Sequence, residues 1–406
     1  MAEKRYLGNP WLSDFTKEGC NSPSKAQETL KLLKPKILTE LESTLKRIDA
    51  HYKSSASSDQ SVYTGTGGLA FLHLHLATSI FSDDKERAQY ELSLCLSFIE
   101  PSLAHLKTHR KTFLCGGAGP LAIAAVCYHK LSRSSESLEC IRRLCSMYSE
   151  NKREFERLPS ELLYGQTGYL YALLFVSSFI PGSIDIGLME EISQLILSSS
   201  TKDSEFPLMY TWHEKHYLGA AHGLAGILTV LMQAIHLKSI SSHIDAIKST
   251  IDKLLTLQFS TGNFPSSLES CSNDKLVQWC HGAPGFVHML GMAYKVFHDE
   301  KYLIAMEKCG EVIWERGLLL KGFGLCHGTA GNAYSLLSLY QSTGQDYHLH
   351  RAIKFCEWCM TETEAGKLPD RPFSLFEGIA GKVIFLADIY YNSQKCHFPA
   401  LGFDSK

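Results

Sequence analysis

The sequence predicts an all-α fold, an α/α-barrel in which seven inner helices are surrounded by seven outer helices. The main observation is a Gly-x-x-Gly element that occurs seven times, 46 to 59 residues apart. Such a regular period is the mark of a repeat architecture. The first glycines of the seven elements are Gly65, Gly116, Gly165, Gly223, Gly282, Gly328 and Gly378.

Each repeat of about fifty residues has room for two helices and two connections, since a mean helix has ~11–12 residues. The segment after each element is apolar almost all round, as in residues 121–126, and such a helix is buried on most sides. Between these segments lie amphipathic, charged helices, for example residues 85–100 and 241–257. Alternation of buried and half-buried helices predicts two concentric rings, with an open solenoid as the alternative.

The segment before the first repeat has a different character. Residues 26–50 read as an amphipathic helix, which Pro35 is expected to kink or divide. A polar loop follows at residues 53–60. No connection is long enough to separate two domains, so we predict one domain over residues 1–406. Residues 1–62 would form an N-terminal helical extension packed on the barrel.

Composition and charge restrict the function. Forty basic and 42 acidic residues give a net charge of −2, which argues against nucleic acid as a partner. The longest uncharged stretch, residues 162–184, contains glycines, a proline and several polar residues, so we expect a buried helix rather than a membrane span. Thirteen cysteines without an apolar leader at the N-terminus suggest reduced thiols in the cytoplasm, with at most peripheral association with the plasma membrane.

Two repeats carry Cys-His directly before the repeat glycine, at Cys280-His281 and Cys326-His327. His222 holds the same position in a third repeat. Because repeats are equivalent, these side chains are expected at one end of the barrel. Thiolates with imidazoles favour Zn²⁺ over harder cations. The alternative is two buried cysteines that pack as small hydrophobic side chains, beside histidines bonded to backbone carbonyls.

The number of ligands determines what a zinc site could do. If only three of these four groups bind zinc, the fourth position stays open, as in catalytic sites. A thiol that enters this position loses its proton at neutral pH. The chemistry expected is therefore nucleophilic addition or transfer by an activated thiolate.

With the motifs WCHGAPG, LCHGTAGN, GAAHGLAG and PFSLFEGIAG, the chain resembles the lanthionine synthetase C-like family, the eukaryotic relatives of bacterial lanthipeptide cyclases. The resemblance covers nearly the whole chain. It implies the same seven-by-seven α/α-barrel. It also implies one zinc per chain, bound by Cys280, Cys326 and His327, with His281 as a neighbour.

The resemblance further implies an activity of the glutathione S-transferase type. The activated thiol would be that of glutathione, and the product a thioether. The acceptor would be a dehydroalanine or dehydrobutyrine residue, formed by elimination from serine, threonine or their phosphates, or else a small electrophile. Partners implied are thus glutathione and dehydrated or phosphorylated proteins or peptides, together with signalling proteins.

Individual residues take roles by the same resemblance. His222 matches the histidine that protonates the enolate formed on addition. Glu161 lies where bacterial cyclases carry an aspartate. Position 367 holds lysine where the family has arginine. This replacement keeps the charge but loses bidentate recognition of carboxylates. The residues implied to contact glutathione are Lys321, Lys367, Leu368, Pro369, Asp370 and Arg5.

Two classes of function remain open from the sequence. The first is an enzyme that adds glutathione to dehydrated residues or small electrophiles. The second is a glutathione-binding and zinc-binding adaptor that regulates signalling proteins, without essential catalysis.

Overall fold

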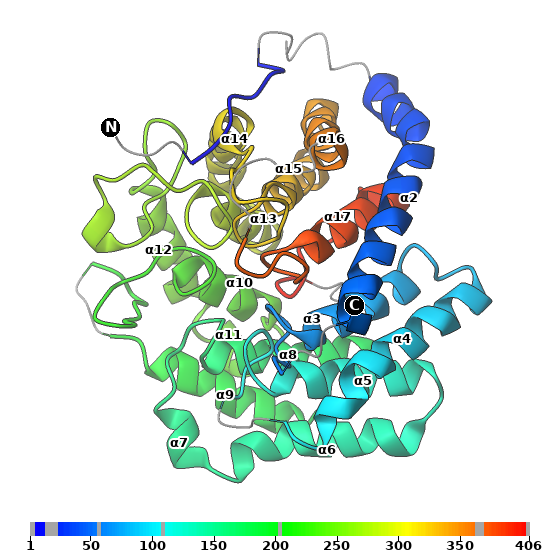
Figure 1. The fold of residues 1–406 in the computed structure, drawn as a ribbon. Helices are drawn as coiled ribbons and strands as arrows, with labels where there is room; N and C mark the ends of the chain where they lie inside the picture. The colour runs from blue at the N-terminus through cyan, green and yellow to red at the C-terminus, as the bar shows by residue number, and fades with distance from the viewer. Residues whose placement is uncertain are drawn as a thin grey trace.

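The computed structural model of the chain describes residues 5–12, 23–54, 58–106, 110–201, 205–361 and 369–402. Over these ranges the regular structure is helical, and only isolated bridges, without named strands, occur between extended segments. The helices are arranged in two rings (Figure 1). The all-α barrel predicted from the repeats is confirmed.

The inner ring contains the helices that follow the seven glycine elements. These are α3 (Thr66–Thr78), α5 (Ala118–Lys130), α8 (Gln166–Phe179), α10 (Leu224–Gln233), α13 (Ala283–Phe297), α15 (Thr329–Thr343) and α17 (Ile379–Asn392). Each packs against the next one, and α17 packs against α3. The ring is therefore closed, and the open solenoid is excluded.

The outer ring contains the amphipathic helices. Six of them are α4 (Lys85–Leu103), α6 (Ser134–Ser149), α9 (Ile186–Ser198), α12 (Ile244–Leu255), α14 (Glu300–Arg316) and α16 (Asp346–Thr361). Shorter elements in the connections are α7 (Lys152–Glu156), α11 (Lys238–Ser241) and the 3₁₀ turn η1 (Leu268–Ser270). Most outer helices pack on the inner helix that precedes them, whereas α12 contacts α13.

The N-terminal helix α2 (Pro23–Ser54) packs against α17 and α16. It thereby serves as the outer partner of α17, and the first and last helices of the described residues lie side by side (Figure 1). Pro35 lies inside α2 and does not divide it into two helices. Since Lys31 and Pro35 are both exposed, water can satisfy the carbonyl group that the proline leaves without a donor.

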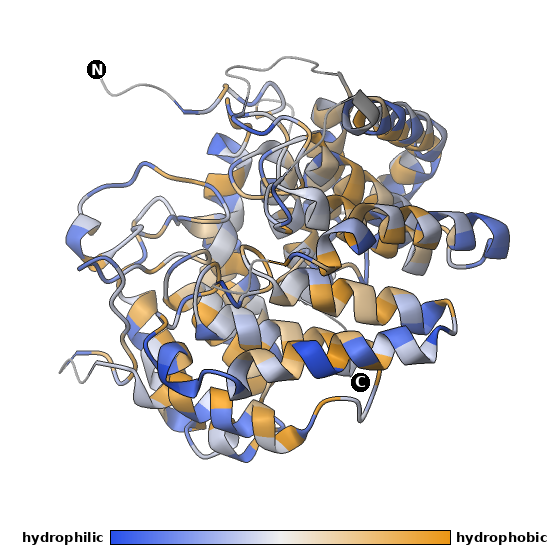
Figure 2. Cartoon of the chain, turned by 60° about the horizontal axis from the view of Figure 1, so that its bottom comes forward, coloured by the Kyte–Doolittle hydropathy of each residue, from blue (hydrophilic) through white to orange (hydrophobic). Residues whose placement is uncertain are grey.

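Burial distinguishes the two rings. In α5 every residue from Ala118 to Tyr128 is buried, whereas α12 buries one face, including Ile247, Ile251 and Leu254. Bands of both hydrophilic and hydrophobic residues appear along the helices at the periphery (Figure 2). The uncharged stretch at residues 162–184 contains α8 of the inner ring. Among the described residues, no helix combines the length and the apolar character needed to cross a bilayer.

The second glycine of every Gly-x-x-Gly element has the same structural role. A Cβ atom at this position would lie 1.9–2.4 Å from the carbonyl oxygen six residues earlier. The loop before each inner helix is therefore packed directly on the first turn of the helix. Only glycine leaves room for this contact, which explains why the element recurs with each repeat.

We expect Gly331→Ala to lower the free energy of unfolding by about 1–3 kcal/mol, the usual cost of overpacking. The added methyl group would meet the carbonyl oxygen of Leu325 at 1.9 Å and displace the loop that carries Cys326. Gly8→Ala is the matched control because nothing lies within 4 Å of its added Cβ. Urea denaturation of both variants measures the difference, and equal stability would contradict the packing role.

Backbone hydrogen bonds join these loops to one another at the position two residues before the repeat glycine. The N–H group of Tyr63 donates to the carbonyl group of Leu114 (2.9 Å), and the N–H group of Phe376 donates to the carbonyl group of Tyr63 (3.1 Å). In the same way, the N–H group of Cys326 donates to the carbonyl group of Phe376 (2.8 Å), and the N–H group of Cys280 donates to the carbonyl group of Cys326 (3.4 Å). The side chains in the loops are consequently held at one end of the barrel.

Candidate metal centre and catalytic site

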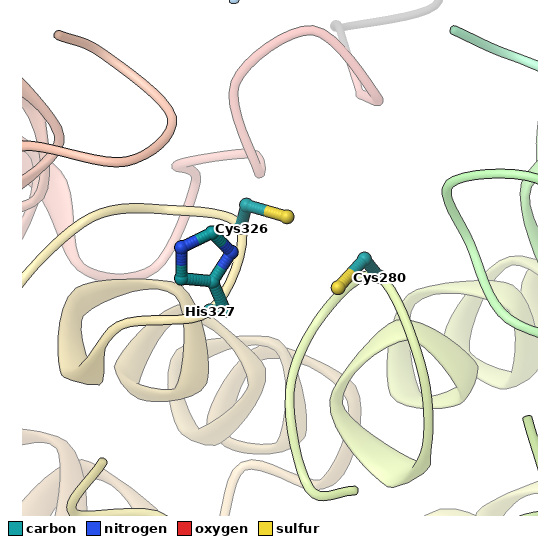
Figure 3. A group of neighbouring side chains, drawn as sticks. All are labelled: Cys280, Cys326 and His327. Atoms are coloured by element: carbon teal, nitrogen blue, oxygen red, sulfur yellow. The ribbon is translucent and has the colours of Figure 1, made fainter. Parts of the chain in front are cut away.

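Cys280, Cys326 and His327 come together at this end of the barrel. Cys280 lies in the loop before α13, and the other two lie in the loop before α15 (Figure 3). Their ligand atoms all lie within 4.8 Å of one another. Cys280 and Cys326 are 8% and 3% exposed, respectively, and their sulfur atoms point toward the gap between the loops (Figure 3).

The two thiols differ in their surroundings. The pKa of Cys280 is held well below its usual range, because Cys326 donates a hydrogen bond to its sulfur and His327 and His281 lie nearby. Gln278 Nε2 also donates to Cys280 Sγ at 3.2 Å. Burial and the adjacent Cys280 raise the pKa of Cys326. The pair thus has the character of one thiolate and one thiol when no metal neutralises it.

The donor set fits a zinc ion. Tetrahedral zinc takes thiolate at about 2.3 Å and imidazole at about 2.0–2.1 Å, which places ligand atoms roughly 3.5–3.8 Å apart. Since the ligand atoms lie within 4.8 Å of one another, a side-chain adjustment of at most about an ångström brings them to these separations. Two sulfurs and one imidazole nitrogen are ligands that zinc prefers, and three protein ligands leave one tetrahedral position for another group.

His222 forms a hydrogen-bonded pair with Glu161. The distance from His222 Nδ1 to Glu161 Oε2 is 2.7 Å. The backbone N–H groups of Leu163 (2.9 Å) and Tyr164 also donate to this carboxylate, which is 2% exposed. Held in this way, the carboxylate fixes the imidazole with Nδ1 toward Glu161 and leaves Nε2 for another partner.

Aromatic rings surround the His222 imidazole. Trp212 stacks on it with a centroid distance of 4.2 Å, and Tyr164 lies nearly parallel at 6.0 Å. Tyr217 contacts it at 6.0 Å. The repeat pattern does not predict these rings around His222. A signal was available for Tyr164, because it directly precedes a repeat glycine, as His222 does.

The loop that carries His222 contacts the loop that carries Cys280. A Cβ atom at Gly219 would lie 2.2 Å from the Cys280 carbonyl oxygen, so the two backbones touch. His281 connects the two groups, since its ring lies 6.4 Å from that of His222 and its charge acts on the Cys280 thiol. The thiol group and the His222–Glu161 pair therefore belong to one site.

Two of the residues assigned to glutathione by resemblance lie on adjacent segments. The carbonyl group of Arg5 accepts a hydrogen bond from Leu320 N at 3.1 Å, and Tyr6 forms a bridge with Leu319. Lys321 follows directly in the chain. Both basic side chains are exposed, so their charged groups are accessible to a ligand.

The other residues assigned to glutathione fall in the segment before the last repeat. Pro369 lies beside Gly322, where an added Cβ would approach the proline ring to 3.6 Å. Asp370 is exposed. Lys367 and Leu368 lie outside the described residues.

Comparisons with known proteins agree with this architecture. A family model described as lanthionine synthetase C-like protein matches residues 56–401. A relative from Danio rerio, named glutathione S-transferase LANCL1, is 41% identical over 96% of this chain and 97% of its own. The structure of nisin cyclase is similar in fold, with a TM-score of 0.67, 17% identity, and coverage of 89% of this chain and 95% of that one. The chain belongs to the lanthionine synthetase C-like family.

Proposed function

We propose that the protein is a zinc-dependent transferase that adds the thiol of glutathione to dehydroalanine or dehydrobutyrine residues in proteins, or to small electrophiles. The observation that carries this proposal is the three-ligand group of Cys280, Cys326 and His327 beside the His222–Glu161 pair. The name of the Danio rerio relative, a glutathione S-transferase, supports glutathione as the thiol.

The three proposed zinc ligands and the residues around them would activate the thiol of glutathione. Zinc bound there would supply the acidity that deprotonates a coordinating thiol at neutral pH. Gln278 donates to the Cys280 sulfur and Tyr63 is hydrogen-bonded to the Cys326 sulfur. These contacts restrict the orientation of the two cysteine side chains, as contacts around metal ligands commonly do.

His222 would complete the addition by donating a proton. As the sulfur–Cβ bond forms, the electron pair of the alkene moves onto the acceptor's Cα as an enolate. A proton on Nε2 of His222 then goes to Cα, and the net reaction adds S and H across the double bond. Glu161 accepts from Nδ1, so it holds the ring in place with Nε2 directed away from the carboxylate.

Lys321 is proposed to bind a carboxylate of glutathione through a charge-assisted hydrogen bond. We expect Lys321→Ala to weaken glutathione binding about three- to tenfold, as for loss of one such contact at an exposed site, without loss of zinc. Lys308→Ala is the control, since Lys308 is an exposed lysine on the outer helix α14. Calorimetry measures glutathione binding to both variants. A change in affinity below about twofold for Lys321→Ala would show that Lys321 does not contact glutathione.

Incubation with glutathione and a dehydroalanine peptide tests the function. The expected product is a peptide whose mass increases by that of one glutathione, and the comparison of dehydrobutyrine peptides and small aromatic electrophiles at equal concentration identifies the preferred acceptor. Glutathione that binds but is not consumed with any acceptor would contradict the enzyme and favour a binding module.

A further inference from the structure

A polar cavity of about 450 Å³ is lined by loops at the same end of the barrel. Its walls include Asp59 and Tyr63 before α3, Arg110 and Cys115 before α5, and Tyr164 before α8. Arg371 completes the lining from the loop before α17. Of the residues assigned to glutathione by resemblance, those that the structure describes are not part of this lining.

The cavity borders both halves of the candidate site. Tyr63 is hydrogen-bonded to the sulfur of Cys326, and its backbone accepts from Phe376 in the ring of loops. Tyr164 lies parallel to the His222 ring at 6.0 Å, and its N–H group donates to Glu161. The side chain of Tyr63 therefore lies between the cavity and the thiol group, and that of Tyr164 lies between the cavity and His222.

Two guanidinium groups give the cavity its charge. Arg110 lies 5.0 Å over the ring of Tyr164, and Arg371 faces the cavity from a different loop. Within the described residues, neither of them is within ion-pair distance of a carboxylate. The acid in the lining is Asp59, whose carboxylate accepts hydrogen bonds from Ser61 N (2.9 Å) and Thr64 Oγ1 (2.6 Å).

The cysteine in the cavity is not a competing nucleophile. Burial raises the pKa of Cys115 to about 12, so its thiol stays protonated at neutral pH, and only the thiolate is nucleophilic. The groups that the cavity offers to a ligand are therefore hydroxyl groups, aromatic faces and the two arginines. Arginine side chains present forked donors that match carboxylates and phosphates.

We propose that this cavity is the acceptor subsite, in which Arg110 and Arg371 bind an anionic side chain next to the dehydroamino residue of a peptide acceptor. The anionic group is a carboxylate or a phosphate. This inference rests on the proposed function, and it specifies the substrate class as acidic or phosphorylated peptides.

Three dehydroalanine peptides that differ at one neighbouring position test the inference. The position holds glutamine, glutamate or phosphoserine. We expect wild-type protein to prefer one or both anionic peptides about tenfold in kcat/KM, the effect of one or two charge-assisted contacts. In the double variant Arg110→Gln, Arg371→Gln, the ratio of anionic to neutral peptide should fall toward one. Arg47→Gln, an exposed arginine on the outer helix α2, should keep the wild-type ratio.

The glutamate and phosphoserine peptides distinguish the two anions. A wild-type ratio near one for both peptides, or a ratio that the double variant retains, would overturn the inference. Binding of the same peptides with serine in place of dehydroalanine, followed by fluorescence anisotropy, separates this outcome from failure of the proposed function. If no peptide reacts but the anionic peptides still bind through the arginines, the cavity assignment stands and the proposed function falls.

Discussion

Replacement of His222 by asparagine is expected to lower the rate of addition by roughly 10²–10⁴-fold, the usual range for a general acid–base group, while zinc and glutathione stay bound. Asparagine can still donate a hydrogen bond to Glu161, but it cannot transfer a proton to the acceptor's Cα. His222 is not in the group of ligand atoms that meet within 4.8 Å, so the metal site should remain intact.

Three measurements on the His222→Asn protein separate catalysis from stability: metal content, melting temperature and turnover. His298→Asn is the matched control, because His298 is exposed in the left-handed conformation at the end of α13, which asparagine tolerates well. A folded, zinc-loaded His222→Asn protein with near-normal turnover would remove His222 from the mechanism.

Removal of both thiols by the double substitution Cys280→Ala, Cys326→Ala is expected to abolish stoichiometric zinc binding and thioether formation. Only His327 of the three ligands would remain, and a single imidazole does not hold zinc against buffer. Cys271→Ala is the control because Cys271 is an exposed free thiol. Metal analysis after dialysis measures the difference. Full stoichiometric zinc in the double variant would contradict the assignment of the ligands.

Much of the fold could be predicted because the Gly-x-x-Gly element recurs at regular intervals in the sequence. The second glycine of each element is required by a contact of about 2 Å with the preceding loop, so the pattern marks the start of every inner helix. Pro35 shows the limit of local rules: it lies within one continuous helix, because its effect depends on whether the freed carbonyl is exposed, which the sequence does not reveal.

The candidate site was predictable where it follows the repeat and not elsewhere. Cys280 and Cys326 lie two residues before their repeat glycines, and His222 and His327 lie one residue before theirs. The equivalence of the repeats therefore predicts that these side chains meet at one end. Trp212 lies instead in the long connection between α9 and α10, which has no periodic pattern. Its stacking on His222 depends on the path of that connection in space.

The most direct test of the central claim, zinc-dependent addition of glutathione, is the rate of thioether formation on a dehydroalanine peptide before and after metal removal. Wild-type protein purified with zinc is treated with a chelator, dialysed and then given back one equivalent of zinc. We expect the peptide–glutathione adduct to form with the initial protein, to be lost after chelation and to return with zinc. An equal rate from the metal-free protein, or no adduct from the zinc-loaded protein, would contradict the claim.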